Sequence, residues 1–217
     1  MKAIAFTTPA EARRAIPGVV EHLRSGGLLA YPTETVYGLG SRPAPRDVEA
    51  LATLKGRVAG KPFLLLVSSR EMAEAQGLAF TESARALARA FWPGPLTLVL
   101  PGGGGRLPDL LRGPEGGIAV RWTSHPLIVS LVAELGEPLT STSANIPGLP
   151  PAPGAEAVLR DFRDAVTAGQ LMVLDGGVLG NRPPSTVVDC TGPQPRVIRP
   201  GAVSLAALRA GAGMLAP

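Results

Sequence analysis

The chain has 217 residues, 45% of them hydrophobic, which suits one large α/β domain or two small ones and excludes a chain that is disordered overall. Its net charge of +4 favours anionic ligands such as nucleotides or RNA, whereas one cysteine and two histidines argue against a disulfide framework, a thiolate zinc site and a histidine metal site. No apolar stretch approaches the roughly 20 residues of a membrane span, and the N-terminus lacks a signal-peptide core, so we expect a soluble, cytoplasmic protein.

The first half of the chain predicts helices that alternate with strands. Residues 8–27 predict a helix with Thr8 as its N-cap and Pro9 in its first turn, which Pro17 splits into two. The other elements expected here are a buried strand over 28–31, a loop over 32–42, a helix over 45–56, an apolar strand over 62–69, and helices around 70–76 and 81–91.

The second half predicts more strands. The expected elements are strands over 96–100 and 117–122 around a mobile glycine loop at 102–105, a helix over 125–136, a strand end and polar loop over 138–148, a helix over 154–162, and strands over 171–177, 185–190 and 196–201. Cys190 is interpreted as a buried strand thiol. The pattern predicts an α/β fold with a mixed sheet and helices on its faces.

Three cations stand close together in "LKGRVAGKPF", residues 54–63, namely Lys55, Arg57 and Lys61. The usual phosphate loop is excluded, because only three residues separate the two glycines and Pro62 follows Lys61 where a hydroxyl should stand. Cations at a helix C-terminus can simply complement the helix dipole in solvent. The interleaved glycines would equally let an anion approach closely, so the segment alone leaves both interpretations open.

Polar side chains follow several of the predicted strands, where open sheets bind ligands. They can form turns and caps, or bind the polar groups of a ligand. The Gly-x-Ser-x-Gly pattern is absent, and no histidine or carboxylate lies near 140–145 in the sequence, so nucleophilic catalysis is disfavoured. Arg121, at a strand end, could be a fork for a carboxylate or a solvated surface group. The candidates after strands are Thr33, Glu34, Thr35, Tyr37, Thr140, Ser141, Thr142, Ser143 and Asn145, and Ser185 and Arg199 lie at further strand ends.

Together these stretches resemble the YrdC family. The matching motifs run in family order from about Ser25 to Gly201, and they are "GGLLAYPTETVYGLG", "LKGRVAGKP", "FWPGPLTLVL", "GIAVRW", "TSTSANIPG", "PSTVVD" and "RVIRPG". Within the family the chain is most similar to the single-domain threonylcarbamoyl-adenylate synthases. The resemblance implies one domain over 1–217, a twisted mixed sheet with a deep basic cavity, and synthesis of L-threonylcarbamoyl-AMP and pyrophosphate from L-threonine, bicarbonate and ATP.

The resemblance also implies site residues, carried over motif by motif. Lys55 and Arg57 would be catalytic, and Arg121 would hold the threonine carboxylate. ATP would be bound by Lys55, Arg57, Lys61, Ser143, Asn145 and Arg199. Threonine would be bound by Thr33, Arg121, Ser141 and Ser185, with Tyr37 lining the pocket between the ligands.

Cofactors and partners follow from the same resemblance. Mg²⁺ is expected, held mainly by the ATP phosphates rather than by a protein metal site. The implied partners are a threonylcarbamoyl transferase complex that acts on tRNA and a tRNA or double-stranded RNA contact, with no membrane.

Two positions depart from the family pattern. Leu66 stands where many relatives have histidine, which leaves one threonine contact open, and Thr142 precedes Ser143 where relatives often have proline. We also expect a loop that encloses the labile carbamate, with 102–106 as the candidate.

Two other functions compete with this interpretation of the sequence. A non-enzymatic module that binds structured RNA is the alternative to an enzyme. The hydrogenase-maturation carbamoyl transferases are disfavoured, since they carry paired-cysteine zinc motifs.

Overall fold

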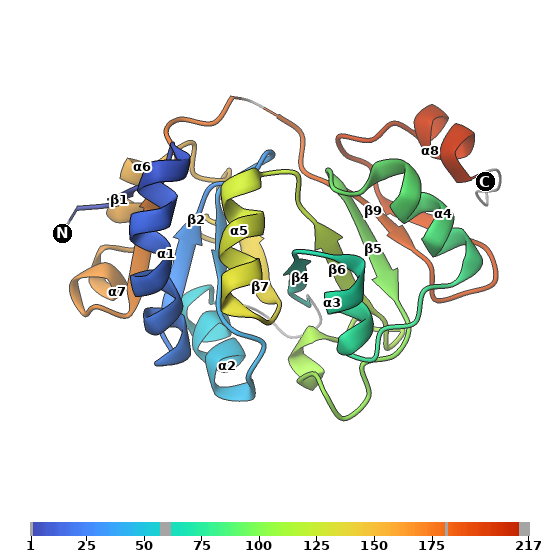
Figure 1. Ribbon diagram of the computed structural model, residues 1–217, viewed down its shortest axis with the longest axis horizontal. Helices are drawn as coiled ribbons and strands as arrows, with labels where there is room; N and C mark the ends of the chain where they lie inside the picture. Colours follow the sequence, from blue (N-terminus) through green and yellow to red (C-terminus); the bar gives the residue numbers. More distant parts are fainter. Residues whose placement is uncertain (1, 57–61, 181, 213–217) are drawn as a thin grey trace.

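The structure is a computed structural model that describes residues 2–56, 62–180 and 182–212, and its strands form one twisted sheet (Figure 1). In order across the sheet they are β1 (Ile4–Ala5), β8 (Leu171–Asp175), β2 (Leu28–Tyr31), β3 (Gly38–Gly40), β7 (Leu139–Ser143), β4 (Leu64–Val67), β6 (Ile118–Trp122), β5 (Leu96–Leu100), β9 (Thr186–Asp189) and β10 (Arg196–Arg199). The neighbours β1–β8, β8–β2, β4–β6 and β5–β9 are parallel, and the others are antiparallel. The predicted mixed sheet is confirmed.

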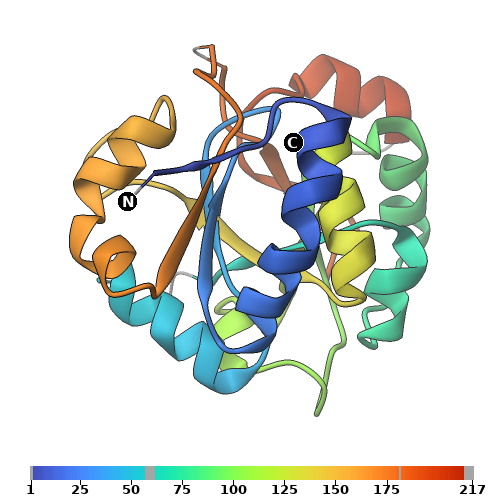
Figure 2. The ribbon, with the colours of Figure 1, turned by 60° about the vertical axis from the view of Figure 1, so that its left-hand side comes forward.

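Helices cover the two faces of this sheet unequally. Two helices, α1 (Pro9–Arg24) and α5 (Pro126–Leu135), pack side by side on one face, as Figure 2 shows. The other face is covered by α2 (Pro45–Leu54), α3 (Arg70–Ala75), α4 (Glu82–Phe91), the 3-10 helix η1 (Asp109–Leu111), α6 (Ala155–Asp161), α7 (Arg163–Thr167) and α8 (Leu205–Ala212). No helix among the described residues is long and apolar enough to cross a membrane.

The alternation of side chains along the strands divides the core into two clusters. In β4, Leu65 and Val67 join the large cluster, whereas Leu64 and Leu66 face the side of α1 and α5. Within the described ranges, the small cluster around α1 and α5 contains no side chain from β5, β6 or β9. On that face, therefore, half of the sheet is left without a helical cover.

The loop predicted over 32–42 contains a strand, β3, which the sequence analysis missed. The glycines of this strand permit close packing. A Cβ on Gly38 would lie 3.0 Å from the Tyr31 ring, and one on Gly40 would overlap the carbonyl oxygen of Thr140. The strand can pair between β2 and β7 because these glycines carry no side chain.

The predicted break at Pro17 is also wrong, since α1 runs without interruption from Pro9 to Arg24. Pro17 lies on the exposed side of the helix, where the carbonyl of Arg13 that loses its partner can bond water. The predicted cap is confirmed: Thr8 accepts a hydrogen bond from the amide of Glu11, and the Glu11 carboxylate bonds the Thr8 amide.

The remaining differences are short elements that were not predicted. They are β1, η1, α7 and α8. Apart from these and β3, the helices and strands lie within a few residues of their predicted ranges. Cys190 is fully buried as predicted, and burial raises the pKa of its thiol to about 12.

We expect Leu98→Ala to lower the free energy of unfolding by about 2–5 kcal/mol, because Leu98 is completely buried in β5 and its removal leaves a cavity. Urea unfolding measures the change. Leu110→Ala is the matched control, since Leu110 is 46% exposed, and should change stability by less than about 0.5 kcal/mol. Equal losses for the two variants would contradict the assignment of Leu98 to the core.

Candidate active site

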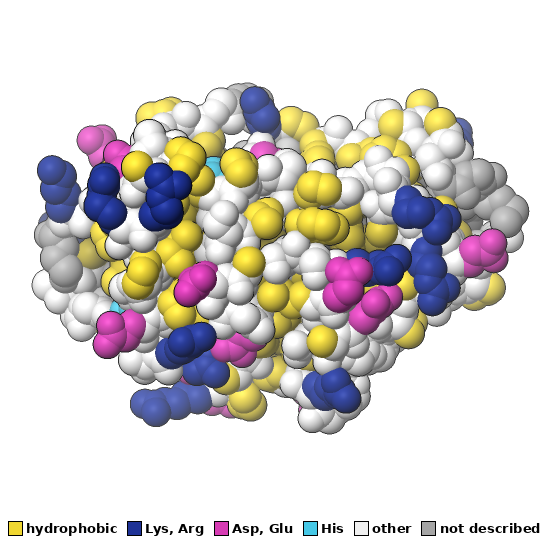
Figure 3. Space-filling view, viewed as in Figure 1, with side chains coloured by type: hydrophobic (Ala, Val, Ile, Leu, Met, Phe, Trp, Pro, Cys, Tyr) yellow, Lys and Arg dark blue, Asp and Glu magenta, His cyan; other side chains and the backbone are white. Residues whose placement is uncertain are grey.

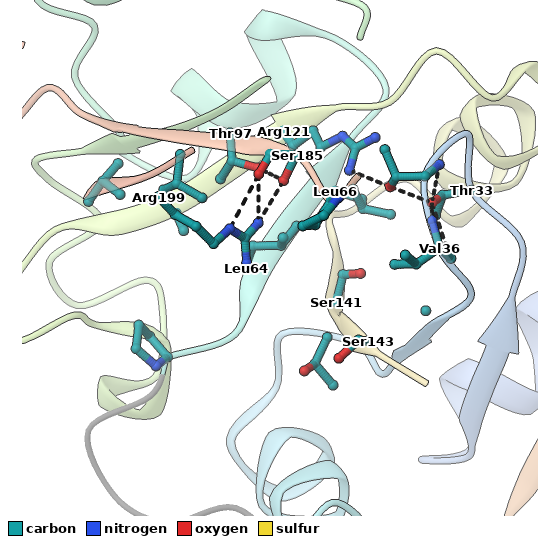
Figure 4. Close-up of a pocket in the computed structure, with 18 of the residues that line it drawn as sticks. Thr33, Val36, Leu64, Leu66, Thr97, Arg121, Ser141, Ser143, Ser185 and Arg199 are labelled. Carbon is teal, nitrogen blue, oxygen red and sulfur yellow. Dashed lines mark hydrogen bonds between the residues drawn. The ribbon is translucent and has the colours of Figure 1, made fainter. Parts of the chain in front are cut away.

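A cavity of about 270 Å³ lies on the uncovered half of the sheet. Its floor is apolar and its edges are polar (Figure 4). The floor is made by side chains that alternate with core residues, among them Leu64, Leu66, Val99, Ala119 and Val187. The polar lining includes Thr33, Thr35, Thr97, Arg121, Ser141, Thr142, Ser143, Ser185 and Arg199. The structure thus brings together six of the predicted site residues around one cavity, namely Thr33, Arg121, Ser141, Ser143, Ser185 and Arg199.

A second hollow of about 560 Å³ adjoins the cavity. The two share five lining residues, which are Thr35, Val36, Ser143, Pro184 and Arg199. The other side of this hollow is lined mainly by the apolar segment 150–153 and by Leu179. The site therefore has two connected compartments, with Ser143 and Arg199 on their boundary.

Arg121 is the buried cation of the cavity, with a side chain only 5% exposed. Its Nε donates to the carbonyl oxygen of Gly94 at 3.1 Å, and its Nη1 donates to the hydroxyl of Thr35 at 3.2 Å. Its Nη2 lies 2.6 Å from Oε1 of Glu34 and forms an ion pair with it, without an aligned hydrogen bond. A buried guanidinium requires such a partner, because an isolated charge in the interior is strongly unfavourable.

The Glu34 carboxylate is held on the other side by the turn that follows β6. Thr123 donates its hydroxyl proton to Oε2, and the amide of Ser124 donates to Oε1 at 2.9 Å. Burial alone would raise the pKa of Glu34, but the charge of Arg121 and these hydrogen bonds lower it to about 2. The pair is therefore ionised at neutral pH.

Arg199 faces the cavity from β10 and is fixed by Ser185. Its Nη2 donates to the carbonyl oxygen of Ser185 at 2.9 Å and to the hydroxyl at 3.0 Å. The Ser185 hydroxyl in turn lies 2.9 Å from that of Thr97. Arg199 is exposed as a residue, yet its guanidinium is partly enclosed, and this burial, followed by repulsion from Arg121, lowers its pKa. Figure 4 shows the two arginines on different sides of the cavity.

Thr97 was not among the predicted site residues. A signal was present in the sequence, because a threonine interrupts the otherwise apolar strand "LTLVL" at a position that alternates with core leucines. The Ser185 hydroxyl, predicted to bind threonine, is engaged with Thr97 and Arg199.

Thr33 organises the loop after β2. Its hydroxyl accepts from the amides of Thr35 and Val36, both at 3.2 Å, and donates to the carbonyl oxygen of Val36 at 2.7 Å. This local turn fixes the backbone that presents Thr35 to Arg121.

Lys55 contacts the loop after β7, which carries Ser143 and Asn145. Lys55 itself does not line the cavity. Its Nζ donates to the carbonyl oxygen of Ser143 at 2.8 Å, to Oδ1 of Asn145 at 2.7 Å, and to the carbonyl oxygen of Asn145. The Ser143 hydroxyl donates to the same Oδ1 at 2.6 Å. These acceptors match the three donors of an ammonium group, so Lys55 fixes the loop that carries Ser143 and Asn145.

The position of Tyr37 differs from the expectation. Tyr37 does not line the cavity, because Val36 and Gly38 face it and the residue between them points to the opposite side. The Tyr37 hydroxyl donates to the carbonyl oxygen of Gly177 at 2.8 Å and accepts from the amide of Gly176 at 2.9 Å. The structure therefore does not place Tyr37 in the lining of either compartment.

The glycine loop proposed to enclose the site lies elsewhere. Gly103 donates its amide proton to the carbonyl oxygen of Gly77 at 2.9 Å, and Arg106 donates to that of Ala75 at 2.5 Å. None of the residues 102–106 lines either compartment. These contacts attach the segment to the end of α3 rather than to the cavity. Leu66, in contrast, does line the cavity floor.

Arg57 and Lys61 lie outside the described residues, so their predicted places are not addressed by the structure. On the face drawn in Figure 3, Lys and Arg side chains stand in several small groups, some with Asp and Glu side chains beside them. The described lining of the two compartments contains no Asp or Glu, and no group of three His, Cys, Asp or Glu side chains among the described residues could hold a metal ion.

The chain was compared with known proteins. The family model Sua5/YciO/YrdC, described as "Telomere recombination", matches residues 21–201. The threonylcarbamoyl-AMP synthase of Pyrococcus abyssi (strain GE5 / Orsay) is 37% identical over 184 residues, which cover 84% of this chain and 53% of the relative. That of Thiobacillus denitrificans is 40% identical over 182 residues, covering 83% of this chain and 94% of the relative.

A solved structure has the same fold. The structure of P. abyssi Sua5 complexed with L-threonine matches with a TM-score of 0.89 and 33% identity, covering 99% of this chain and 62% of that one. The chain spans about half the length of the archaeal relative and nearly all of the bacterial one. The family match covers most of the chain and agrees with the motifs and the fold, and the chain therefore belongs to the Sua5/YciO/YrdC family.

Proposed function

We propose that this chain is a threonylcarbamoyl-AMP synthase, which converts L-threonine, bicarbonate and ATP into L-threonylcarbamoyladenylate and pyrophosphate. The observation that carries the proposal is the cavity with Arg121 on one side and Arg199 on another, separated by an apolar floor and hydroxyl groups. Such a site suits two anionic ligands that must be aligned. Relatives at 37–40% identity bear this name, and the structure of a relative contains L-threonine.

The reaction needs alignment more than a strong base. The amine of threonine and bicarbonate form a carbamate with loss of water. A carbamate oxygen then attacks the α-phosphorus of ATP, the bond from this phosphorus to the bridging oxygen breaks, and pyrophosphate leaves with the electron pair. Displacements at phosphorus depend on positioning and on neutralising charge. A lining of arginines and hydroxyls, without a catalytic triad, meets these needs.

The site residues that the structure describes have the following roles in this reaction. Arg121 binds the threonine carboxylate through its charge and the Nη1 proton that its protein contacts leave over, and Ser141 lines the same cavity. Arg199 neutralises charge on the phosphates from the boundary between the compartments. Lys55 acts by holding Ser143 and Asn145 in place.

The rest of the ATP site is proposed from the family motifs. Arg57 and Lys61 would approach the triphosphate from the segment that follows α2. Mg²⁺ prefers carboxylate and other oxygen ligands, and the described lining offers no carboxylate, so we propose that the ion arrives with ATP and is held by the phosphates. No step above depends on a protein-bound metal.

The product is an activated carbamoyl group and requires an acceptor. We propose that a threonylcarbamoyl transferase that modifies tRNA consumes it. A direct contact of this chain with tRNA is part of the same proposal and rests on the net charge of +4 alone.

The direct test is a pyrophosphate-release assay. ATP should yield pyrophosphate only when both L-threonine and bicarbonate are present, because the carbamate is the attacking group. Omission of either should reduce the rate to background. Release that is indifferent to threonine would refute the proposal.

Arg199→Ala should lower kcat/KM for ATP by about 10- to 1,000-fold, because it removes a cation from the phosphate side of the site. Steady-state kinetics at saturating threonine measure this. The matched control is Arg196→Ala at the other end of β10, whose side chain pairs with Glu115 and Asp189 outside the cavity. Similar losses in both variants would show that β10 matters only for stability.

Lys55→Met and Asn145→Ala should each lower activity by about tenfold or more, because either one releases the loop after β7. If Lys55 acts through Asn145, the double variant should be no worse than the more damaged single variant. Turnover of all three measures the coupling. Fully additive losses would instead indicate that Lys55 contacts the substrate directly.

A further inference from the structure

Glu34 lies behind the wall of the cavity rather than in it. Thr33 and Thr35 line the cavity, whereas Glu34 between them does not, and its side chain is 14% exposed. Its carboxylate instead joins the loop after β2 to Thr123 and Ser124, which follow β6.

The contacts of Arg121 leave part of its fork unused. Its Nε bonds Gly94, and Nη1 uses one of its two protons on Thr35. Its Nη2 is buried and lies 2.6 Å from Oε1 of Glu34, so the carboxylate occupies this end of the fork. The ion pair therefore fixes the position and charge of the guanidinium, while the second proton of Nη1 remains for a ligand.

We propose that Glu34 is a positioning residue for substrate recognition, which holds Arg121 so that the remaining Nη1 donor and the positive charge face the threonine carboxylate. This inference rests on the proposed function. Glu34 itself touches no substrate; it acts through Arg121.

A second effect of Glu34 would change the affinity for threonine in the opposite direction. Glu34 carries the same charge as the carboxylate of threonine, so its removal could also strengthen binding by removing repulsion. Positioning should prevail, because an unpaired Arg121 would turn toward other acceptors and lose its alignment with the carboxylate of threonine. The sign of the change in threonine affinity therefore distinguishes the two effects.

Two substitutions separate loss of contact from loss of charge. Glu34→Ala removes the side chain that holds Arg121. Glu34→Gln keeps its length, since the amide oxygen can still face Arg121 and Ser124 while the amide NH2 donates to the Thr123 hydroxyl. Glu137→Ala is the matched control, because Glu137 forms a half-buried pair with Arg42 away from both compartments.

Calorimetric titration of the full chain with L-threonine and, separately, with ATP tests the inference. Glu34→Ala should weaken threonine binding by about tenfold or more and change ATP binding by less than about twofold. Glu34→Gln should weaken threonine binding by a smaller factor, and Glu137→Ala should leave both affinities unchanged.

Threonine affinity that is unchanged or higher in the Glu34 variants overturns the inference, as does an equal loss of threonine and ATP binding. If Glu34→Ala does not fold, the comparison of Glu34→Gln with the unaltered chain decides by the same criteria. An unaltered chain that binds ATP but no threonine would overturn the proposed function itself, which is a separate result.

Discussion

The unequal covering of the sheet is the constraint on which the site depends. Side chains of adjacent positions in a strand point to opposite faces, so the strands β4, β5 and β6 must satisfy two environments at once. One face meets the large helical cluster and is leucine- and valine-rich. The other meets α1 and α5 only as far as Leu66, and beyond that it is open to a ligand. The cavity therefore belongs to the architecture of the sheet rather than to a single loop.

This arrangement also explains how far the sequence could be interpreted. Continuous apolar runs such as "LLAY" and "FLLLV" predict buried strands correctly, since their composition is decided by burial. The strand β3 could not be predicted, because its glycines are required by the Tyr31 ring in the neighbouring strand and by the Thr140 carbonyl, which is distant in the sequence. The break expected at Pro17 failed for a related reason, since its effect depends on which side of the helix meets solvent.

Prediction of the site was limited by the same kind of long-range information. Motifs indicated Arg121, Ser141 and Arg199, and the structure places these around one cavity. Motifs could not indicate that the aromatic ring of Tyr37 points away, nor that Thr97 joins Ser185. Neighbours across a sheet are set by strand order, and this order places β5 beside β9 although nearly ninety residues of chain separate the Thr97 and Ser185 hydroxyls.

The energies of these contacts decide which of them a ligand can rearrange. The hydroxyls of Thr97 and Ser185 are bonded to each other, and an exchange of one neutral hydrogen bond for another changes the free energy by only about 0.5–1.5 kcal/mol. Ser185 can therefore release a partner when a substrate arrives. Loss of one partner from a buried ion pair costs about 3–5 kcal/mol, so the pair between Arg121 and Glu34 is the contact that is harder to exchange. The site thus combines exchangeable hydroxyls with one firmly held cation, and under the proposed function this cation defines where the carboxylate of threonine lies.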